Sequence, residues 1–220
     1  MTNLRNHNVP NMMIIRRTLL GAMIALALMA ALPGAAYAQS PTDARSFIEA
    51  TAQSAIATMA DKQLSRNDRD DRFRALFVSA FDIPEIGRFV LSRHWRTATP
   101  EQQHEFLTLF EEITVLTWAR RFQDYDDERL ETLEATKSGE RDWMVSSRIV
   151  KREGPPNPVQ WRIRQGTDGA FRITDIIAEG VSMAITLRSD YASTMQANGG
   201  RIDTLLATMR TKLDQLRAAG

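Results

Sequence analysis

The spacing of apolar residues along the chain changes twice. Between residues 41 and 124, apolar side chains recur every three to four residues, which is typical of amphipathic helices. From residue 130 to residue 178, apolar and polar residues alternate, which is typical of half-buried strands. Helical spacing then returns and continues to residue 217. This order of helices, strands and helices predicts a single α+β domain.

The first helical stretch divides into four predicted helices. Three of them cover residues 41–59, 70–81 and 100–124, and a short helix opened by Asp82 lies between the second and the last. The start of the long helix is the most clearly marked. Thr99 can cap it, Pro100 suits its first turn, and Gln102 completes a capping box.

The alternating stretch predicts four strands, separated by short polar connections. We expect them over residues 130–137, 143–151, 159–165 and 171–178. Short connections favour an antiparallel meander. Two more helices should follow, over residues 181–197 and 202–217. The predicted fold is therefore a four-stranded antiparallel sheet wrapped by about six helices.

The N-terminus has the pattern of a secretory signal peptide. An arginine pair precedes the apolar run 18–32, which is shorter than the ~20 residues that a transmembrane helix needs. The tripeptide Ala36-Tyr37-Ala38 offers the small residues that a signal peptidase needs. We therefore expect residues 1–38 to be removed by cleavage before Gln39, leaving residues 39–220 as one exported domain. An uncleaved membrane anchor is the alternative.

Composition narrows the class of protein further. Removal of 38 of the 220 residues leaves 182. The leader holds three of the 28 basic residues and none of the 27 acidic ones, so the mature chain has 25 against 27 and a net charge of −2. Such a chain has no global field for nucleic acid. It also lacks cysteine, so it has neither disulfides nor thiolate chemistry and must bury a core.

Residues suited to catalysis or metal binding are sparse. His94 and His104 belong to no metal-spaced pair, and the acidic run 124–128 lacks the glycine of a calcium-binding loop. We therefore predict no metal and no cofactor. The candidate for an enzyme is Asp175, since a carboxylate in a cone-shaped, nuclear-transport-factor-two-like sheet can serve a hydrolase or isomerase. Strict alternation places Asp175 on the face of Ile173, unless a bulge turns it outward.

Two long blocks of the chain, residues 81–122 and 161–206, carry a resemblance. The first contains a Phe-Asp-x-Pro turn and Trp95-Arg96 before Thr-Pro-Glu-Gln. The second contains Asp175 followed by a Glu-Gly-Val-Ser turn, then Tyr191 and a Gly-Gly pair before the last helix. Together they resemble the MlaC family, the auxiliary or toluene-tolerance component of a lipid ABC transport system.

The resemblance implies a periplasmic phospholipid carrier rather than an enzyme. Members shuttle phospholipid between an outer-membrane lipoprotein complex and an inner-membrane ABC transporter complex, which maintains outer-membrane lipid asymmetry. Hopanoid-associated relatives share the pattern, so the cargo is either a phospholipid or a hopanoid-related lipid. We expect a monomer with an apolar cavity. An enzyme that uses Asp175 and a periplasmic adaptor that binds no lipid are the alternatives.

The apolar faces are the candidates for contact with the acyl tails, and for each residue an ordinary core position is the alternative. The candidates are Val145, Ile149, Trp161, Ile163, Phe171 and Ile173 in the sheet, Val181, Ile185 and Tyr191 in the following helix, and Phe106, Phe110 and Ile113 in the long helix. A basic set is predicted to meet headgroups or partner proteins, or else to be a solvated face: Arg93, Arg96, Arg120 and Arg121.

Overall fold

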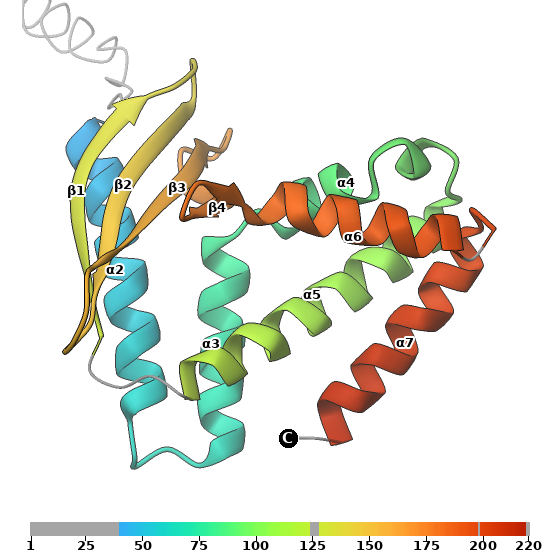
Figure 1. Ribbon diagram of the computed structural model, residues 1–220, viewed down its shortest axis with the longest axis horizontal. Coiled ribbons are helices and arrows are strands. Elements are labelled where there is room, and N and C mark those ends of the chain that lie inside the picture. The colour runs from blue at the N-terminus through green and yellow to red at the C-terminus, as the bar shows by residue number, and fades with distance from the viewer. Residues whose placement is uncertain (1–39, 124–127, 198, 219–220) are drawn as a thin grey trace, which may run out of the picture. The chain divides into compact units, whose positions relative to one another are not determined.

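The computed structural model describes residues 40–123, 128–197 and 199–218 of the chain (Figure 1). These residues form six α-helices, one 3-10 helix and one five-stranded sheet, so the predicted α+β class is confirmed. The predicted signal peptide and most of the acidic run 124–128 lie outside the described residues. None of the helices in the described part is long and apolar enough to cross a membrane.

Most helices begin where a side chain caps the first turn. Asp82 accepts a hydrogen bond from the Glu85 amide, and the predicted capping box of Thr99 and Gln102 is present, with hydrogen bonds of 3.0 and 3.3 Å. The helices are α2 (Pro41–Ala60), α3 (Arg66–Ala80), α4 (Ile83–Leu91), the 3-10 helix η2 (Ser92–Arg96), α5 (Pro100–Gln123), α6 (Met183–Ala197) and α7 (Ile202–Ala218).

Two helix starts differ from the prediction. The helix predicted from residue 70 begins at Arg66, because the Ser65 hydroxyl accepts a hydrogen bond from the Asp68 amide at 3.1 Å and caps it earlier. The helix predicted from residue 181 begins at Met183, because the two residues before it form a short strand. Both differences arise from local hydrogen bonding that the apolar spacing does not report.

The strands form the predicted antiparallel meander, in the order β1-β2-β3-β4-β5. A fifth strand was not predicted. It has two residues and pairs with the end of β4 through a tight turn at Glu179 and Gly180, whose φ angles are 52° and 82°. The strands are β1 (Arg129–Lys137), β2 (Asp142–Val150), β3 (Asn157–Gln165), β4 (Phe171–Ala178) and β5 (Val181–Ser182).

A bulge in β4 decides which way Asp175 faces. Ile163 lies opposite Ile173, but the preceding residue of β3, Arg162, lies opposite Asp175, so Thr174 is an extra residue on β4. Beyond the bulge the alternation resumes out of phase. Asp175 therefore shares the face of Arg162, on the side of the sheet away from Ile163 and Ile173.

The helices cover the sheet unequally. In Figure 1, α2 lies along the sheet, and α4, α5, α6 and α7 gather beside it, beyond the end of β4. Two apolar cores result. One packs α2 against the sheet around Ile48, Val145 and Ile163, and the other packs the helices together around Phe106 and Phe110. Between the two cores, where α2, α3 and α5 meet the sheet, a cavity remains.

Candidate functional site

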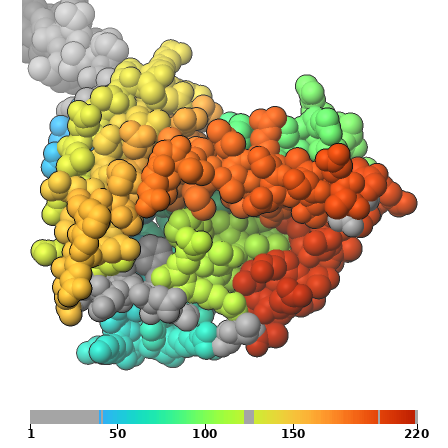
Figure 2. Space-filling view, in the orientation of Figure 1, coloured from blue at the N-terminus to red at the C-terminus, as the bar shows by residue number. Residues whose placement is uncertain are grey.

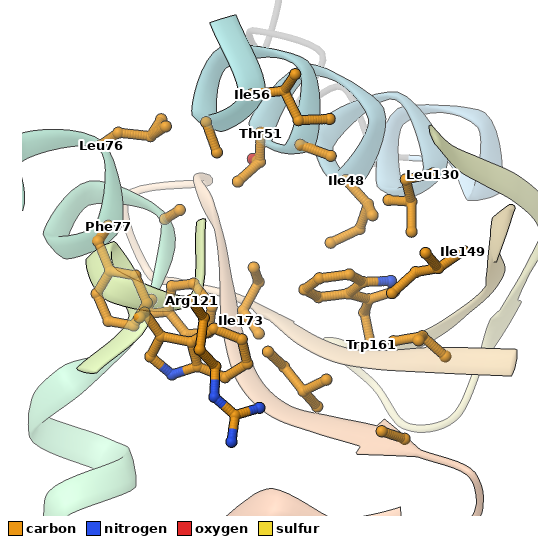
Figure 3. Close-up of a pocket in the computed structure, with 18 of the residues that line it drawn as sticks. Ile48, Thr51, Ile56, Leu76, Phe77, Arg121, Leu130, Ile149, Trp161 and Ile173 are labelled. Carbon is orange, nitrogen blue, oxygen red and sulfur yellow. The ribbon is translucent and has the colours of Figure 1, made fainter. Parts of the chain in front are cut away.

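An apolar cavity of about 410 Å³ opens between α2, α3, the C-terminal part of α5 and the sheet (Figure 3). The sheet supplies mainly aliphatic side chains and one tryptophan, α2 supplies small and aliphatic residues, and α3 supplies two phenylalanines, a leucine and an alanine. The lining residues include Ile149, Trp161 and Ile173 in the sheet, Thr51, Ala52 and Ala55 in α2, and Phe73 and Phe77 in α3.

The sheet wall is built around Trp161, whose ring lies opposite α2 in Figure 3. Its indole Nε1–H donates a hydrogen bond to the Ser147 hydroxyl at 2.8 Å, and that hydroxyl donates to the Val159 carbonyl at 2.9 Å. Both polar groups are therefore satisfied within the sheet. As a result, Trp161 offers the cavity only the hydrocarbon surface of its ring.

The wall formed by α2 is likewise free of unsatisfied polar groups. Thr51 lines the cavity, but its hydroxyl donates to the Phe47 carbonyl of the same helix at 2.8 Å. Ala52 and Ala55 follow on the same side of the helix. Their short side chains leave space that a larger residue would fill.

Charged residues line one end of the cavity. Arg121, Glu128 and Arg129 are there, near the end of α5 and the start of β1. The Arg121 guanidinium lies 5.6 Å from the ring centre of Trp118, and in Figure 3 it points away from the apolar side chains. The site therefore has a hydrocarbon interior and a charged edge, which suits an amphipathic ligand.

Asp175, the candidate catalytic residue, is not among the residues that line this cavity. Its carboxylate accepts hydrogen bonds from the Ser182 hydroxyl at 2.6 Å and from the Ala184 amide at 3.0 Å. Ser182 in turn accepts from the Ile185 amide at 3.1 Å. Asp175 thus fixes the N-terminal turn of α6, and its facing away from the cavity follows from the β4 bulge.

The cavity brings together only some of the residues predicted from the sequence. Ile149, Trp161, Ile173 and Arg121 line it. The other three sheet candidates are fully or nearly buried in the core between α2 and the sheet: Val145, Ile163 and Phe171. They lie on the same face of the sheet as Trp161 and Ile173, and we see them as core residues.

The helix candidates lie elsewhere. Phe106, Phe110, Ile113 and Tyr191 pack in or against the core of the helices, and Val181 and Ile185 are exposed by 57% and 59%. Three predicted basic residues also lie away from the cavity. Arg120 donates to the Leu216 carbonyl of α7, Arg96 is exposed at the end of η2, and Arg93 lines a second pocket.

The cavity residues of α2 and α3 were not proposed from the sequence. Both helices were predicted from the helical spacing of their apolar residues. A stripe shows that a helix is amphipathic, but it does not show which element the stripe covers. The run of mostly small residues between Ile48 and Ile56 is a signal that could have suggested a hollow wall.

Comparisons with known proteins agree on one family. A family model described as MlaC protein matches residues 49–211. The toluene tolerance protein ttg2D of Pseudomonas putida is 22% identical over 195 residues, which are 86% of each chain. A solved phospholipid-binding protein from Ralstonia solanacearum, in complex with a phospholipid, has a TM-score of 0.68 and 20% identity, covering 79% of this chain and 98% of that chain. At that identity, the structural likeness shows a shared fold.

Proposed function

The chain belongs to the MlaC family, and from this premise we propose that it carries a phospholipid with its acyl tails inside the cavity. The observation that supports this most directly is the cavity wall. The Thr51 hydroxyl is bonded within α2 and the Trp161 indole is bonded within the sheet, so these two walls present hydrocarbon to a ligand. A wall of this kind stabilises an acyl tail and offers little to a polar substrate.

The physical need for a carrier follows from the cost of exposing tails to water. Two acyl tails contain roughly 30 methylene groups, and at ~0.8 kcal/mol each their exposure costs roughly 24 kcal/mol. The cavity of about 410 Å³ lies within the ~300–1,000 Å³ range that is typical of ligand pockets.

The charged end of the cavity gives the lipid an orientation in this proposal. With the tail inside, the headgroup lies at the charged edge, which contains Arg121 and Arg129 together with Glu128. Guanidinium groups bind phosphate oxygens strongly and in a defined geometry. The protein then needs no deep polar pocket, because the headgroup stays in contact with water.

The wider role proposed here is transfer through the periplasm. Residues 1–38 act as an export signal, and residues 39–220 form a monomeric lipid-binding domain. The domain exchanges lipid with an outer-membrane lipoprotein complex and with an inner-membrane ABC transporter complex, and so maintains outer-membrane lipid asymmetry. The ttg2D relative is named for toluene tolerance. Such a name fits a protein whose loss weakens the outer membrane as a barrier.

The test is to purify the mature protein from the periplasm, extract it with solvent and analyse the extract by mass spectrometry. We expect about one phospholipid per protein. The larger side chain of Ala52→Trp should fill the cavity and lower the lipid content. Ala57→Trp, on the exposed side of the same helix, should leave the lipid content unchanged. Absence of co-purified lipid, together with no uptake from liposomes, would refute the proposal.

A further inference from the structure

A second pocket of about 250 Å³ lies between α6 and the corner where α4 passes into η2. It shares no lining residue with the apolar cavity. In Figure 2 the α4–η2 segment, in green, lies against α6, in orange to red. Val90, Leu91 and Met195 contribute buried apolar surface. The polar lining residues are Ser92, Arg93, His94, Arg188 and Tyr191.

Two arginines line this pocket, and each contacts the ring of a neighbouring residue. Arg93 Nε donates to His94 Nε2 at 3.3 Å, and the Arg188 guanidinium lies 5.2 Å from the ring centre of Phe89. Within the described part of the chain, neither arginine has a carboxylate at ion-pair distance, whereas Arg88 pairs with Glu85 at 3.8 Å. No acidic residue lines the pocket. Its positive charge is therefore not neutralised from within.

The remaining polar groups can act as hydrogen-bond donors. His94 accepts through Nε2, so in the neutral ring Nδ1 carries the hydrogen. Burial, and secondarily the charge of Asp190, raises the pKa of the Tyr191 hydroxyl, which therefore stays protonated at neutral pH. The Tyr191 and Ser92 side chains both line the pocket. Hydroxyl and imidazole donors beside two guanidiniums favour an acceptor-rich anion.

The backbone at this corner is strained. Ser92 has φ 56° and ψ −128°, a left-handed conformation that residues with a side chain rarely adopt. Its amide donates to the Arg88 carbonyl and ends α4 at this point, so that Arg93 and His94 follow directly in η2. Strained residues of this kind persist where the surrounding structure holds them, and they concentrate at binding sites.

We propose that the pocket between η2 and α6 binds a phosphate group. A guanidinium presents a planar fork that matches two phosphate oxygens, and Arg93 and Arg188 supply one fork each. The volume accommodates a phosphate with a short organic group but is too small for an acyl tail in addition. The phosphate comes either from a soluble ester or from a lipid headgroup at a membrane surface. The site is independent of the tail cavity, so neither proposal requires the other.

The two histidines of the mature chain provide a direct test by proton NMR. His94 lines the pocket, whereas His104 is exposed on α5 and serves as an internal reference. Inorganic phosphate and glycerol 3-phosphate are titrated at fixed pH and ionic strength. We expect a saturable shift of the His94 ring signals, with a dissociation constant of about 1 mM or below, and no saturable shift at His104. Succinate serves as the carboxylate competitor.

The arginine requirement is tested with a pair of charge-matched double variants. Arg93→Gln with Arg188→Gln should weaken phosphate binding at least tenfold. Arg66→Gln with Arg72→Gln removes the same charge from the exposed surface of α3 and should bind phosphate as the wild type does. Circular dichroism and a thermal unfolding curve check that both variants fold. Vesicles of phosphatidylglycerol and of phosphatidylcholine test the membrane source of the phosphate by flotation.

Each result decides for or against the proposal. Saturable binding of the soluble phosphates that the first double variant loses supports a soluble ester. Flotation with phosphatidylglycerol vesicles that only the first double variant loses, without binding of free phosphate, supports a lipid headgroup. Binding that both double variants retain, equal competition by succinate, or no response to any probe would overturn the phosphate assignment.

Discussion

At the scale of single residues, the hydrogen bond from Trp161 to Ser147 keeps the cavity wall apolar. Ser147→Ala removes the acceptor of the indole N–H and leaves that group without a partner in a part-buried position. We expect a loss of about 1–3 kcal/mol in the free energy of unfolding, measured by urea denaturation. Ser146→Ala, one residue earlier and on the other face of β2, should change it by less than about 0.5 kcal/mol. If Ser146→Ala lowered the free energy of unfolding as much as Ser147→Ala, loss of the hydrogen bond from Trp161 would not explain the destabilisation.

Asp175 has a structural role at the N-terminus of α6. Asp175→Asn should lower the free energy of unfolding by about 1–2 kcal/mol, because a charged cap of the α6 N-terminus is replaced by a neutral one. Lipid content and uptake from liposomes should match those of the wild type. A variant with normal stability but lost uptake would instead mean that the carboxylate acts on the ligand.

The face of β4 on which Asp175 lies could not be predicted from the alternation of apolar and polar residues. The alternation of residues 171–174 was correct and placed Ile173 on the cavity side. A bulge adds one residue without changing which residue types are present, so the sequence allowed both directions for Asp175. The partners of its carboxylate, Ser182 and Ala184, lie beyond β4, so the alternation within the strand does not report them.

At the scale of helices, α3 and α5 each carry buried phenylalanines but use them differently. Phe77 of α3 lines the cavity, and Phe110 of α5 packs against Phe106 and Tyr191 in the core of the helices. Phe110→Ala should lower the free energy of unfolding by about 3–5 kcal/mol while the folded protein keeps its lipid. Phe77→Ala should also destabilise the protein, and in addition change the lipid content per folded molecule. Mass spectrometry of the folded fraction, isolated by gel filtration, distinguishes the two.

The existence of most of these elements could be predicted, but the partner of each apolar stripe could not. The capping box at Thr99 marks the start of α5 in the sequence itself. The assignment of its stripe to α7 depends on contacts far along the chain, such as that between Glu105 and Arg210. The sequence therefore allowed Phe106 and Phe110 to line a cavity. The structure places them in the core of the helices instead.

At the scale of the whole molecule, the cavity lies between the core against the sheet and the core of the helices. α2 contributes to both of them, with Ile48 in the core against the sheet and Met59 in the core of the helices. The residues that line the cavity come from segments between Ile48 and Met183. A ligand in this position contacts both cores at once. Its binding therefore adds directly to the stability of the fold.

This linkage gives a prediction for the complete protein. Delipidated protein should unfold at a lower temperature than lipid-loaded protein, since a ligand present at about 100 times its dissociation constant stabilises the native state by ~2.7 kcal/mol. Ala52→Trp fills the cavity with its own side chain, so adding lipid should raise its unfolding temperature much less. Scanning calorimetry of the two proteins, each with and without lipid, measures both effects. If lipid raised the unfolding temperature of Ala52→Trp as much as that of the wild type, the lipid would have to bind outside this cavity.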